Sequence, residues 1–292
     1  MNNLDIVMLL QVLVNAILLG GMYAIISVGL NLIFGVLKVI NFAHGELIML
    51  GMYVSYWLAF LYGLNPYLTL PITAITLFVI GVCIERVLIK PLLNAPPINQ
   101  LLTTAALILV IQNLALILWR ADYRGITVRM PLITLGPVFI SATRFIAFAG
   151  GIAASLILYY LLMKTDVGIR IRAVAQDPEV SQLLGVNVPR IQTITFGLGA
   201  LLAGVSGSLM IPIFMVNPTV GGSFGLIAWV IIVLGGLGSF TGALIGSFIV
   251  GFIEAFIGVL ISLEIARAVA FLAFILILLF KPAGILGERA RV

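Results

Sequence analysis

Residues 191–253 read IQTITFGLGALLAGVSGSLMIPIFMVNPTVGGSFGLIAWVIIVLGGLGSFTGALIGSFIVGFI, without one charged side chain. About 20 apolar residues are enough for one helix to cross the hydrocarbon core of a bilayer. Further uncharged runs of similar or greater length lie at 6–37, 47–84, 91–119 and 145–163. They are continuous rather than alternating, which is typical of membrane helices and not of barrel strands. The sequence therefore predicts an all-α transmembrane fold, a polytopic helical bundle.

The composition excludes a water-soluble enzyme. Of the 292 residues, 63% are hydrophobic and 9% are charged, and the mean hydropathy is +1.29. The chain has one histidine and one cysteine, Cys83, so no catalytic set, disulfide or metal site is expected. The net charge of +5 comes from basic residues at the ends of the apolar runs, a pattern of membrane topology rather than of nucleic-acid binding.

Dividing the runs at Gly, Pro and Asn predicts eight or nine spans. They lie near 8–34, 46–63, 67–84, 100–119, 145–163, 191–213, 223–238, 241–261 and 265–280. Alternating these spans places ten of the 15 basic residues on one side, which the positive-inside rule assigns to the cytoplasm. The N-terminus is then outside and the C-terminus is cytoplasmic. The stretch 223–238 is short enough to re-enter the membrane instead of crossing it.

This topology makes residues 1–292 one transmembrane domain with two long connections. Residues 120–144 form an external loop, which is expected to be polar and irregular. It is either a solvated loop or a surface for an extracytoplasmic partner. Residues 164–190 form the longest cytoplasmic connection.

The cytoplasmic connection contains a short helix with both ends specified by the sequence. Residues 173–188 read AVAQDPEVSQLLGVNV. Asp177 is a good N-cap, Pro178 suits the first helical position and Glu179 suits the positive end of the helix dipole. Gly185 is placed to terminate the helix. A helix over 177–185 is therefore predicted outside the membrane.

One face of this helix is apolar although it lies outside the bilayer. Val180, Leu183 and Leu184 recur at positions i, i+3 and i+4. Arg170 and Arg172, just before the helix, supply charge for an acidic partner surface or for lipid phosphates. The apolar face either docks onto a partner or lies on the membrane surface.

Several stretches resemble a known family. The predicted cytoplasmic helix, followed by Gly185 and then by the span ITFGLGALLAGVSGSLM (194–210), resembles the coupling segment of ABC importer permeases. In that family the segment fits a groove on the ATPase subunit. GLNLIFGVLKVINFAHGELIMLGMY (29–53), LGGLGSFTGALIGSFIVGFIEAF (234–256) and AFLAFILILLFKPAGILG (270–287) resemble the membrane subunit of high-affinity branched-chain amino acid ABC transporters. INFAHGE and FKPAGILG are the most specific pieces.

The resemblance implies import of leucine, isoleucine and valine across a bacterial inner membrane by a multi-pass subunit. It implies four kinds of neighbour: a second homologous permease subunit, two cytoplasmic ABC ATPase subunits, a periplasmic substrate-binding protein and membrane lipid. Nucleic acid is not an expected partner. None of the four lysines follows a Gly-x-x-x-x-Gly loop, so the chain has no phosphate-binding P-loop. We expect no cofactor in this chain, with ATP and Mg²⁺ bound by the ATPase.

Rows of small residues predict close helix packing. Gly238, Gly242 and Gly246 are four apart, and Gly204 and Gly207 each follow an alanine by four residues. Such rows allow helix backbones to approach closely within lipid. We expect both rows to form packing surfaces, within the subunit or between subunits.

Polar residues in the spans are tentative candidates for a translocation path. Asn15, Tyr23, Ser27 and Asn31 lie on or near one face of the first span. Glu254 lies within a span, where an unpartnered charge costs about 2.5 kcal/mol or more. Either these groups line a path or they bond to neighbouring helices.

Two other polar groups have simpler interpretations. Glu264 and Arg267 are three residues apart and predict a local ion pair. Asn41, His44 and Glu46 are expected to cap a helix and fix a loop.

Two alternative functions stay open. The first is an ABC permease for another small polar solute, such as urea, short amides or other amino acids. The second is an ion-coupled secondary transporter or channel, in which Glu254 is the only strong candidate for a coupling carboxylate.

Overall fold

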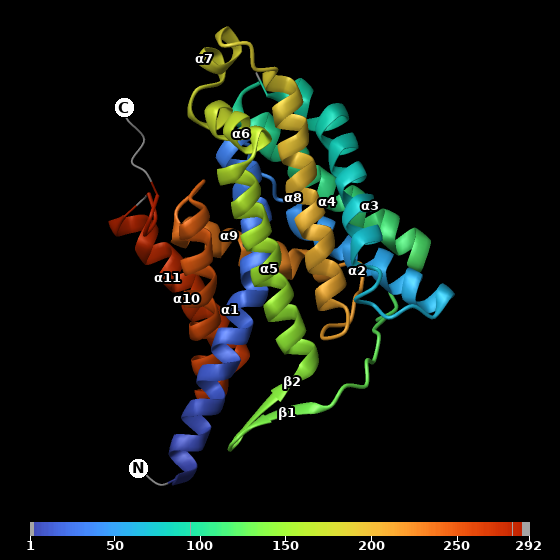
Figure 1. Ribbon diagram of the computed structural model, residues 1–292, viewed down its shortest axis with the longest axis vertical. Helices are drawn as coiled ribbons and strands as arrows, with labels where there is room; N and C mark the ends of the chain where they lie inside the picture. Colours follow the sequence, from blue (N-terminus) through green and yellow to red (C-terminus); the bar gives the residue numbers. More distant parts are fainter. Residues whose placement is uncertain (1–2, 94, 282, 288–292) are drawn as a thin grey trace.

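The computed structural model shows a helical bundle with one small β-hairpin (Figure 1). The structure describes residues 3–93, 95–281 and 283–287. The long helices are α1 (Asn3–Leu37), α2 (His44–Tyr62), α3 (Leu70–Ile84), α4 (Pro97–Trp119), α5 (Ala142–Lys164), α8 (Val188–Met210), α10 (Phe240–Leu260) and α11 (Leu263–Phe280). A π-helical turn (Glu85–Ile89) and a 3-10 turn (Lys90–Leu92) extend α3 to Leu92. With this extension, eight segments are long and apolar enough to cross a membrane, so the predicted all-α transmembrane fold is confirmed.

The predicted span near 223–238 forms a short helix, α9 (Val220–Gly235). Its 16 residues correspond to about 24 Å at 1.5 Å per residue, less than the ~30 Å hydrocarbon core. The helix is nevertheless apolar and largely buried in the bundle. The sequence correctly marked this stretch as too short for an ordinary span.

Two helices organise the core. α1 packs along α10, α8 and α5, and α8 packs along α3, α2 and α1. Most of α8 is buried inside the chain, whereas α4 and α11 expose most of their apolar surface. Those two helices therefore meet lipid or another subunit, while α1 and α8 hold the fold together.

Glycines of α8 allow its close contacts with α2 and α3. A Cβ at Gly207 would press on the α2 backbone at Gly51 and Met52. A Cβ at Gly204 would meet the Thr73 carbonyl of α3 at 2.9 Å. Both glycines therefore lie where α8 meets its neighbours in the same subunit, the kind of small-residue contact that brings membrane helices together.

Gly238, Gly242 and Gly246 all make the expected close packing contacts, Gly238 with Gly35 of α1, but the three do not form one row on α10. Gly242 and Gly246 pack against the backbone of α9 at Gly235 and Ile231. Gly238, by contrast, lies in the turn before α10, with a φ of 81°. The reason is local: the Ser239 side chain accepts a hydrogen bond from the Gly242 N–H at 3.1 Å, so the helix begins after Gly238.

The connection 120–144 is more regular than expected. It contains strands β1 (Leu132–Leu135) and β2 (Val138–Ser141), which pair antiparallel. The Gln11 side chain of α1 acts as a further strand partner: its Nε2 donates to the Phe139 carbonyl at 2.8 Å and its Oε1 accepts from the Phe139 N–H at 2.9 Å. Arg124 also exchanges two backbone hydrogen bonds with Val216, in the α8–α9 connection. The loop is thus attached to two parts of the bundle, and the prediction of an irregular loop was wrong.

Candidate functional site

Two short helices, α6 (Asp166–Gln176) and α7 (Pro178–Leu183), protrude at the end of the bundle opposite the hairpin (Figure 1). The Asp177 side chain caps α7 by accepting a hydrogen bond from the Val180 N–H at 3.0 Å. Pro178 occupies the first turn, and Gly185 follows the helix with a φ of 84°. The local signals at Asp177, Pro178 and Gly185 thus gave the helix and both its ends correctly.

The tip of α7 exposes large apolar side chains. Leu183 is 86% exposed and Leu184 is 79% exposed, and Val180 is about half exposed. Glu179 is exposed on the same short helix. Two leucines side by side at the end of a protruding helix form a contiguous apolar surface that soluble surfaces seldom leave uncovered. We call Val180, Leu183 and Leu184 the α7 tip.

The helix α6 was not predicted, and it carries both arginines. The Thr165 side chain caps it by accepting from the Gly168 N–H at 3.1 Å. Ile171 of α6 is buried, while Arg170 and Arg172 are exposed on either side of it. α6 thus packs on the bundle through one apolar face. Its exposed arginines lie at the same end of the bundle as the α7 tip.

The polar residues of α1 bond to other parts of the bundle at two levels. The Tyr23 hydroxyl donates to the Glu254 carboxylate of α10, and both groups are buried. Two turns further on, the Asn31 side chain accepts from the Gly238 N–H at 2.7 Å. Ser27 is also buried, and its hydroxyl bonds back to the Tyr23 carbonyl at 2.9 Å.

Asn15 is partly buried and lies two turns before Tyr23 on α1. The structure therefore brings Tyr23 and Glu254 together, but it distributes the other stripe residues along the helix. The hydrogen bonds of Tyr23 and Asn31 hold α1 against α10 and the turn before it.

The ion pair of Arg267 is not the predicted one. Its Nε lies 4.0 Å from Glu254 Oε1, so the pair connects α11 to α10. Within the described residues no ion pair joins Arg267 to Glu264. Spacing along one helix suggested the local partner, but the turn between α10 and α11 brings a buried carboxylate closer.

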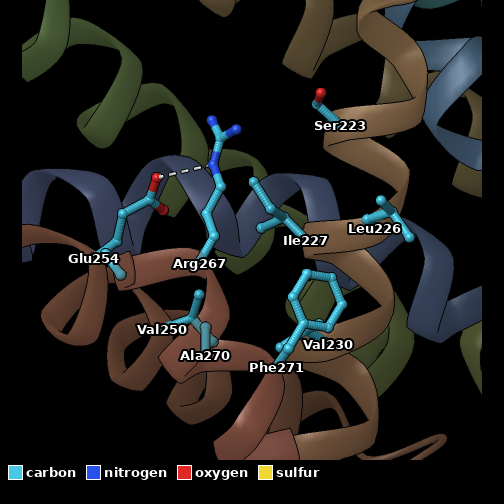
Figure 2. Close-up of a pocket in the computed structure, with 10 residues that line it drawn as sticks. Ser223, Leu226, Ile227, Val230, Val250, Glu254, Arg267, Ala270 and Phe271 are labelled. Carbon is cyan, nitrogen blue, oxygen red and sulfur yellow. Dashed lines mark ion pairs between the residues drawn. The ribbon is translucent and has the colours of Figure 1, made fainter. Parts of the chain in front are cut away.

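A cavity lies beside this pair, between α9, α10 and α11 (Figure 2). Its volume is about 80 Å³. Its walls include Leu226, Ile227 and Val230 of α9, Glu254 of α10, and Arg267 and Phe271 of α11. One carboxylate, one guanidinium and the Ser223 hydroxyl are thus the polar groups of a largely apolar cavity.

Glu85 is another buried acid, and it was not predicted from the sequence. Glu85 is fully buried in the π-helical turn after α3, and its Oε2 accepts from the Thr193 hydroxyl of α8 at 2.7 Å. It lies just beyond the predicted end of a span, where a charged residue is ordinary. Its partner is more than 100 positions away in the sequence, so no local pattern indicated the contact.

The family described as "branched-chain amino acid transport system / permease component" matches residues 12–278 of this chain. The chain belongs to this family. It is a multi-pass membrane permease, of a family of transport components rather than enzymes.

Relatives cover nearly the whole permease. The high-affinity branched-chain amino acid transport system permease protein BraD of Pseudomonas aeruginosa is 32% identical, over 96% of each chain. The corresponding permease protein LivH of Escherichia coli K12 is 31% identical, again over 96% of each chain. The fructose import permease protein FrcC of Rhizobium meliloti is 34% identical over 30% of this chain and 24% of its own. No solved structure matches this permease.

The two most specific stretches of this permease both contact the short helix α9. In INFAHGE, Gly45 packs against Gly221 and Gly225 in the first turns of α9. In FKPAGILG, the N–H groups of Ile285 and Leu286 donate to the last carbonyls of α9, at 3.0 and 2.9 Å. These motifs therefore hold the two ends of a helix that lipid alone would not support, because its terminal carbonyls need partners.

INFAHGE also fixes the loop before α2, as expected, but the expected side-chain cap of this helix is not formed. The Asn41 side chain accepts from the Ala43 N–H at 3.1 Å, and Gln112 of α4 donates to Glu46 at 2.9 Å. His44 is fully buried beside them. Through Glu46 and Gly45, the motif thus connects the start of α2 to both α4 and α9.

Proposed function

We propose that this chain is the membrane-spanning permease subunit of an ATP-driven ABC importer that translocates leucine, isoleucine and valine. The observation that carries the proposal is the similarity over 96% of the chain to permeases whose names specify branched-chain amino acid transport. In this proposal the subunit works with a second permease subunit, two cytoplasmic ABC ATPases and a periplasmic substrate-binding protein. ATP and Mg²⁺ are bound by the ATPases.

The proposed orientation places α6 and α7 in the cytoplasm and the hairpin outside. Its support is the distribution of charge: up to the end of α8, seven of the 11 basic residues fall on the α7 side of the spans. This orientation puts the α7 tip where a cytoplasmic ATPase reaches it. It also puts the hairpin where a periplasmic protein arrives.

The α7 tip has the properties of a docking element. Its leucines are 86% and 79% exposed, so covering them removes almost their full side-chain surface from water. Fully burying one leucine side chain is worth roughly 1.5–3 kcal/mol. A contact of this size that differs between two ATPase conformations biases the permease between its inward-open and outward-open states.

Ion-coupled transport is less well supported. Coupling needs a carboxylate that exchanges its cation, as an acid lining a midplane site does. Glu254 instead receives the Tyr23 hydroxyl on one oxygen and faces Arg267 with the other. Its negative charge is matched by one fixed cation of the chain, Arg267, so the pair has no net charge with which to hold a free coupling cation.

A different cargo is the second candidate, and one observation favours it. The local match to a fructose import permease indicates that part of this scaffold is shared with a carrier of an uncharged solute. The two cargoes are separated by uptake of labelled leucine against labelled fructose.

Purification of the tagged chain in mild detergent, followed by mass spectrometry, tests the assembly. We expect a P-loop ATPase and a second permease to stay bound. The double substitution Leu183→Asp and Leu184→Asp should release the ATPase, whereas Gln182→Asp, on the same helix, should retain it.

Reconstitution tests the driving force. We expect leucine uptake to need ATP on the side of the ATPases and to persist when a protonophore collapses the proton gradient. A chain that purifies alone and moves leucine without ATP would overturn the proposal.

A further inference from the structure

Arg267 is a charged residue whose side chain is exposed on a membrane helix. It lies one turn into α11, a helix that is apolar beyond its first turn, which carries Glu264, and 51% of the Arg267 side chain is exposed, against 9% for its partner Glu254. A guanidinium within a membrane span faces protein or water, because acyl chains do not solvate it. Figure 2 shows the side chain directed toward Glu254. This face of α9, α10 and α11 therefore borders water, at the membrane interface or in a water-filled space, or a second subunit.

The ion pair at this face is incomplete. The Arg267 Nε and the Glu254 Oε1 are 4.0 Å apart, beyond the 2.7–3.2 Å of a hydrogen bond. The other carboxylate oxygen is occupied by the Tyr23 hydroxyl, which fixes the carboxylate from behind. Within the described part of the chain, the guanidinium donates no hydrogen bond. The carboxylate is thus held in place by Tyr23, and the guanidinium beside it has all its hydrogen-bond donors left for a ligand.

The walls next to the pair are apolar. Leu226 and Ile227 of α9 and Phe271 of α11 line the same cavity, and Leu226 and Phe271 are partly open to its mouth. Figure 2 shows the pair on one side of the chamber and these side chains on the other. The cavity therefore joins two opposite charges to a hydrophobic wall.

We infer that this cavity binds the zwitterionic head and apolar side chain of an α-amino acid during translocation. The ligand carboxylate bonds to the Arg267 guanidinium, which suits planar bidentate contacts. Its ammonium bonds to Glu254 Oε1, and its side chain lies against Leu226, Ile227 and Phe271. The inference rests on the proposed function, and it adds the residues that contact the cargo.

Charge balance favours this ligand class. The site carries one positive and one negative charge, so a zwitterion enters without leaving a net charge in the membrane. A sugar or urea offers no charge to either group. The cavity, of about 80 Å³, is open on one side, so a ligand of leucine's size extends beyond its mouth.

The first test measures leucine uptake by the reconstituted complex with ATP and binding protein. Arg267→Gln should lower uptake about ten- to hundredfold, the loss expected for a charge-assisted hydrogen bond. Arg267→Lys should retain part of the activity, because it keeps the charge. Arg144→Gln, an exposed arginine at the start of α5, is the matched control and should transport as the wild type does. Complex assembly and ATP hydrolysis are measured for each variant.

The second test does not depend on transport. In a Cys83→Ser background, Leu226→Cys is labelled with a water-soluble methanethiosulfonate reagent. Leucine should slow the labelling several-fold, and leucinol, which lacks the carboxylate, should not. Leu132→Cys, on the exposed strand β1 outside the spans, is the control whose labelling leucine should leave unchanged.

The outcomes separate the two proposals. If the wild-type complex imports no branched-chain amino acid, the proposed function is wrong and this site falls with it. If the wild type imports leucine but Arg267→Gln is equally active, the site is wrong and the proposed function stands. The same holds if leucinol protects Leu226→Cys as well as leucine does, or if neither protects it.

Discussion

Truncating the two leucines of the α7 tip should weaken ATPase binding without unfolding the permease. Leu183 and Leu184 are 86% and 79% exposed in the chain alone, so their substitution removes little internal packing. Each Leu→Ala change removes three carbons, worth about 0.8 kcal/mol each when buried on docking, or about 5 kcal/mol for the pair. At 1.4 kcal/mol per factor of ten, the affinity should fall by about three orders of magnitude.

The assay compares the double variant Leu183→Ala and Leu184→Ala with Gln182→Ala in lipid nanodiscs. Labelled ATPase is titrated onto each, and the melting temperature of the permease is measured alongside. We expect the control to bind as the wild type does and all three proteins to melt alike, because exposed substitutions usually change stability by less than about 0.5 kcal/mol.

A double variant whose Kd for the ATPase stays within about threefold of wild type, a difference below 1 kcal/mol, would refute this reasoning. The exposed leucines would then be a surface that the ATPase leaves uncovered. A double variant that melts well below the control would also contradict it, because it would show that the tip packs within the chain.

Three further substitutions test other contacts. Asp177→Ala removes the cap of α7, a loss of about 1 kcal/mol, so hydrogen exchange of the Val180 amide should accelerate about fivefold; Asp177→Asn should exchange as the wild type does, and unchanged exchange in the alanine variant would show that the cap is dispensable. Gly242→Leu places a side chain on the Gly235 backbone and should reduce the monodisperse folded fraction on size exclusion, with Gly242→Ala intermediate; full yield of the leucine variant would contradict the close α9–α10 contact. Gln11→Leu removes two hydrogen bonds to Phe139, worth about 1–3 kcal/mol together, and should speed exchange of the Phe139 amide, whereas equal exchange would mean that the hairpin holds itself.

The helices were largely predictable because their signals are local. Uncharged runs specify spans, and the shortness of the stretch that became α9 was visible in its length. The hairpin was not predictable in the same way. Its position depends on Gln11, which lies more than 120 positions before its partner Phe139 and offers no repeating pattern.

In the candidate site, too, the features set by local sequence were predictable and those set by long-range contacts were not. Asp177, Pro178 and Gly185 act within one turn of chain, so the ends of α7 followed from the sequence. The partner of Arg267 did not follow, since helix spacing favours Glu264 while the fold supplies Glu254. Gly238 was misplaced for a related reason: spacing alone does not reveal that Ser239 begins a new helix.

The donation from Ile285 and Leu286 to α9 has a consequence for how the protein is made. During synthesis α9 leaves the ribosome before these residues exist, so its last carbonyls must stay hydrated or in the insertion machinery. The helix therefore settles only after α11 has been inserted and the segment behind it has folded back. The last step of folding is therefore the docking of Ile285 and Leu286 on α9. A nascent chain that ends before these residues would expose the uncapped carbonyls of α9 to membrane proteases.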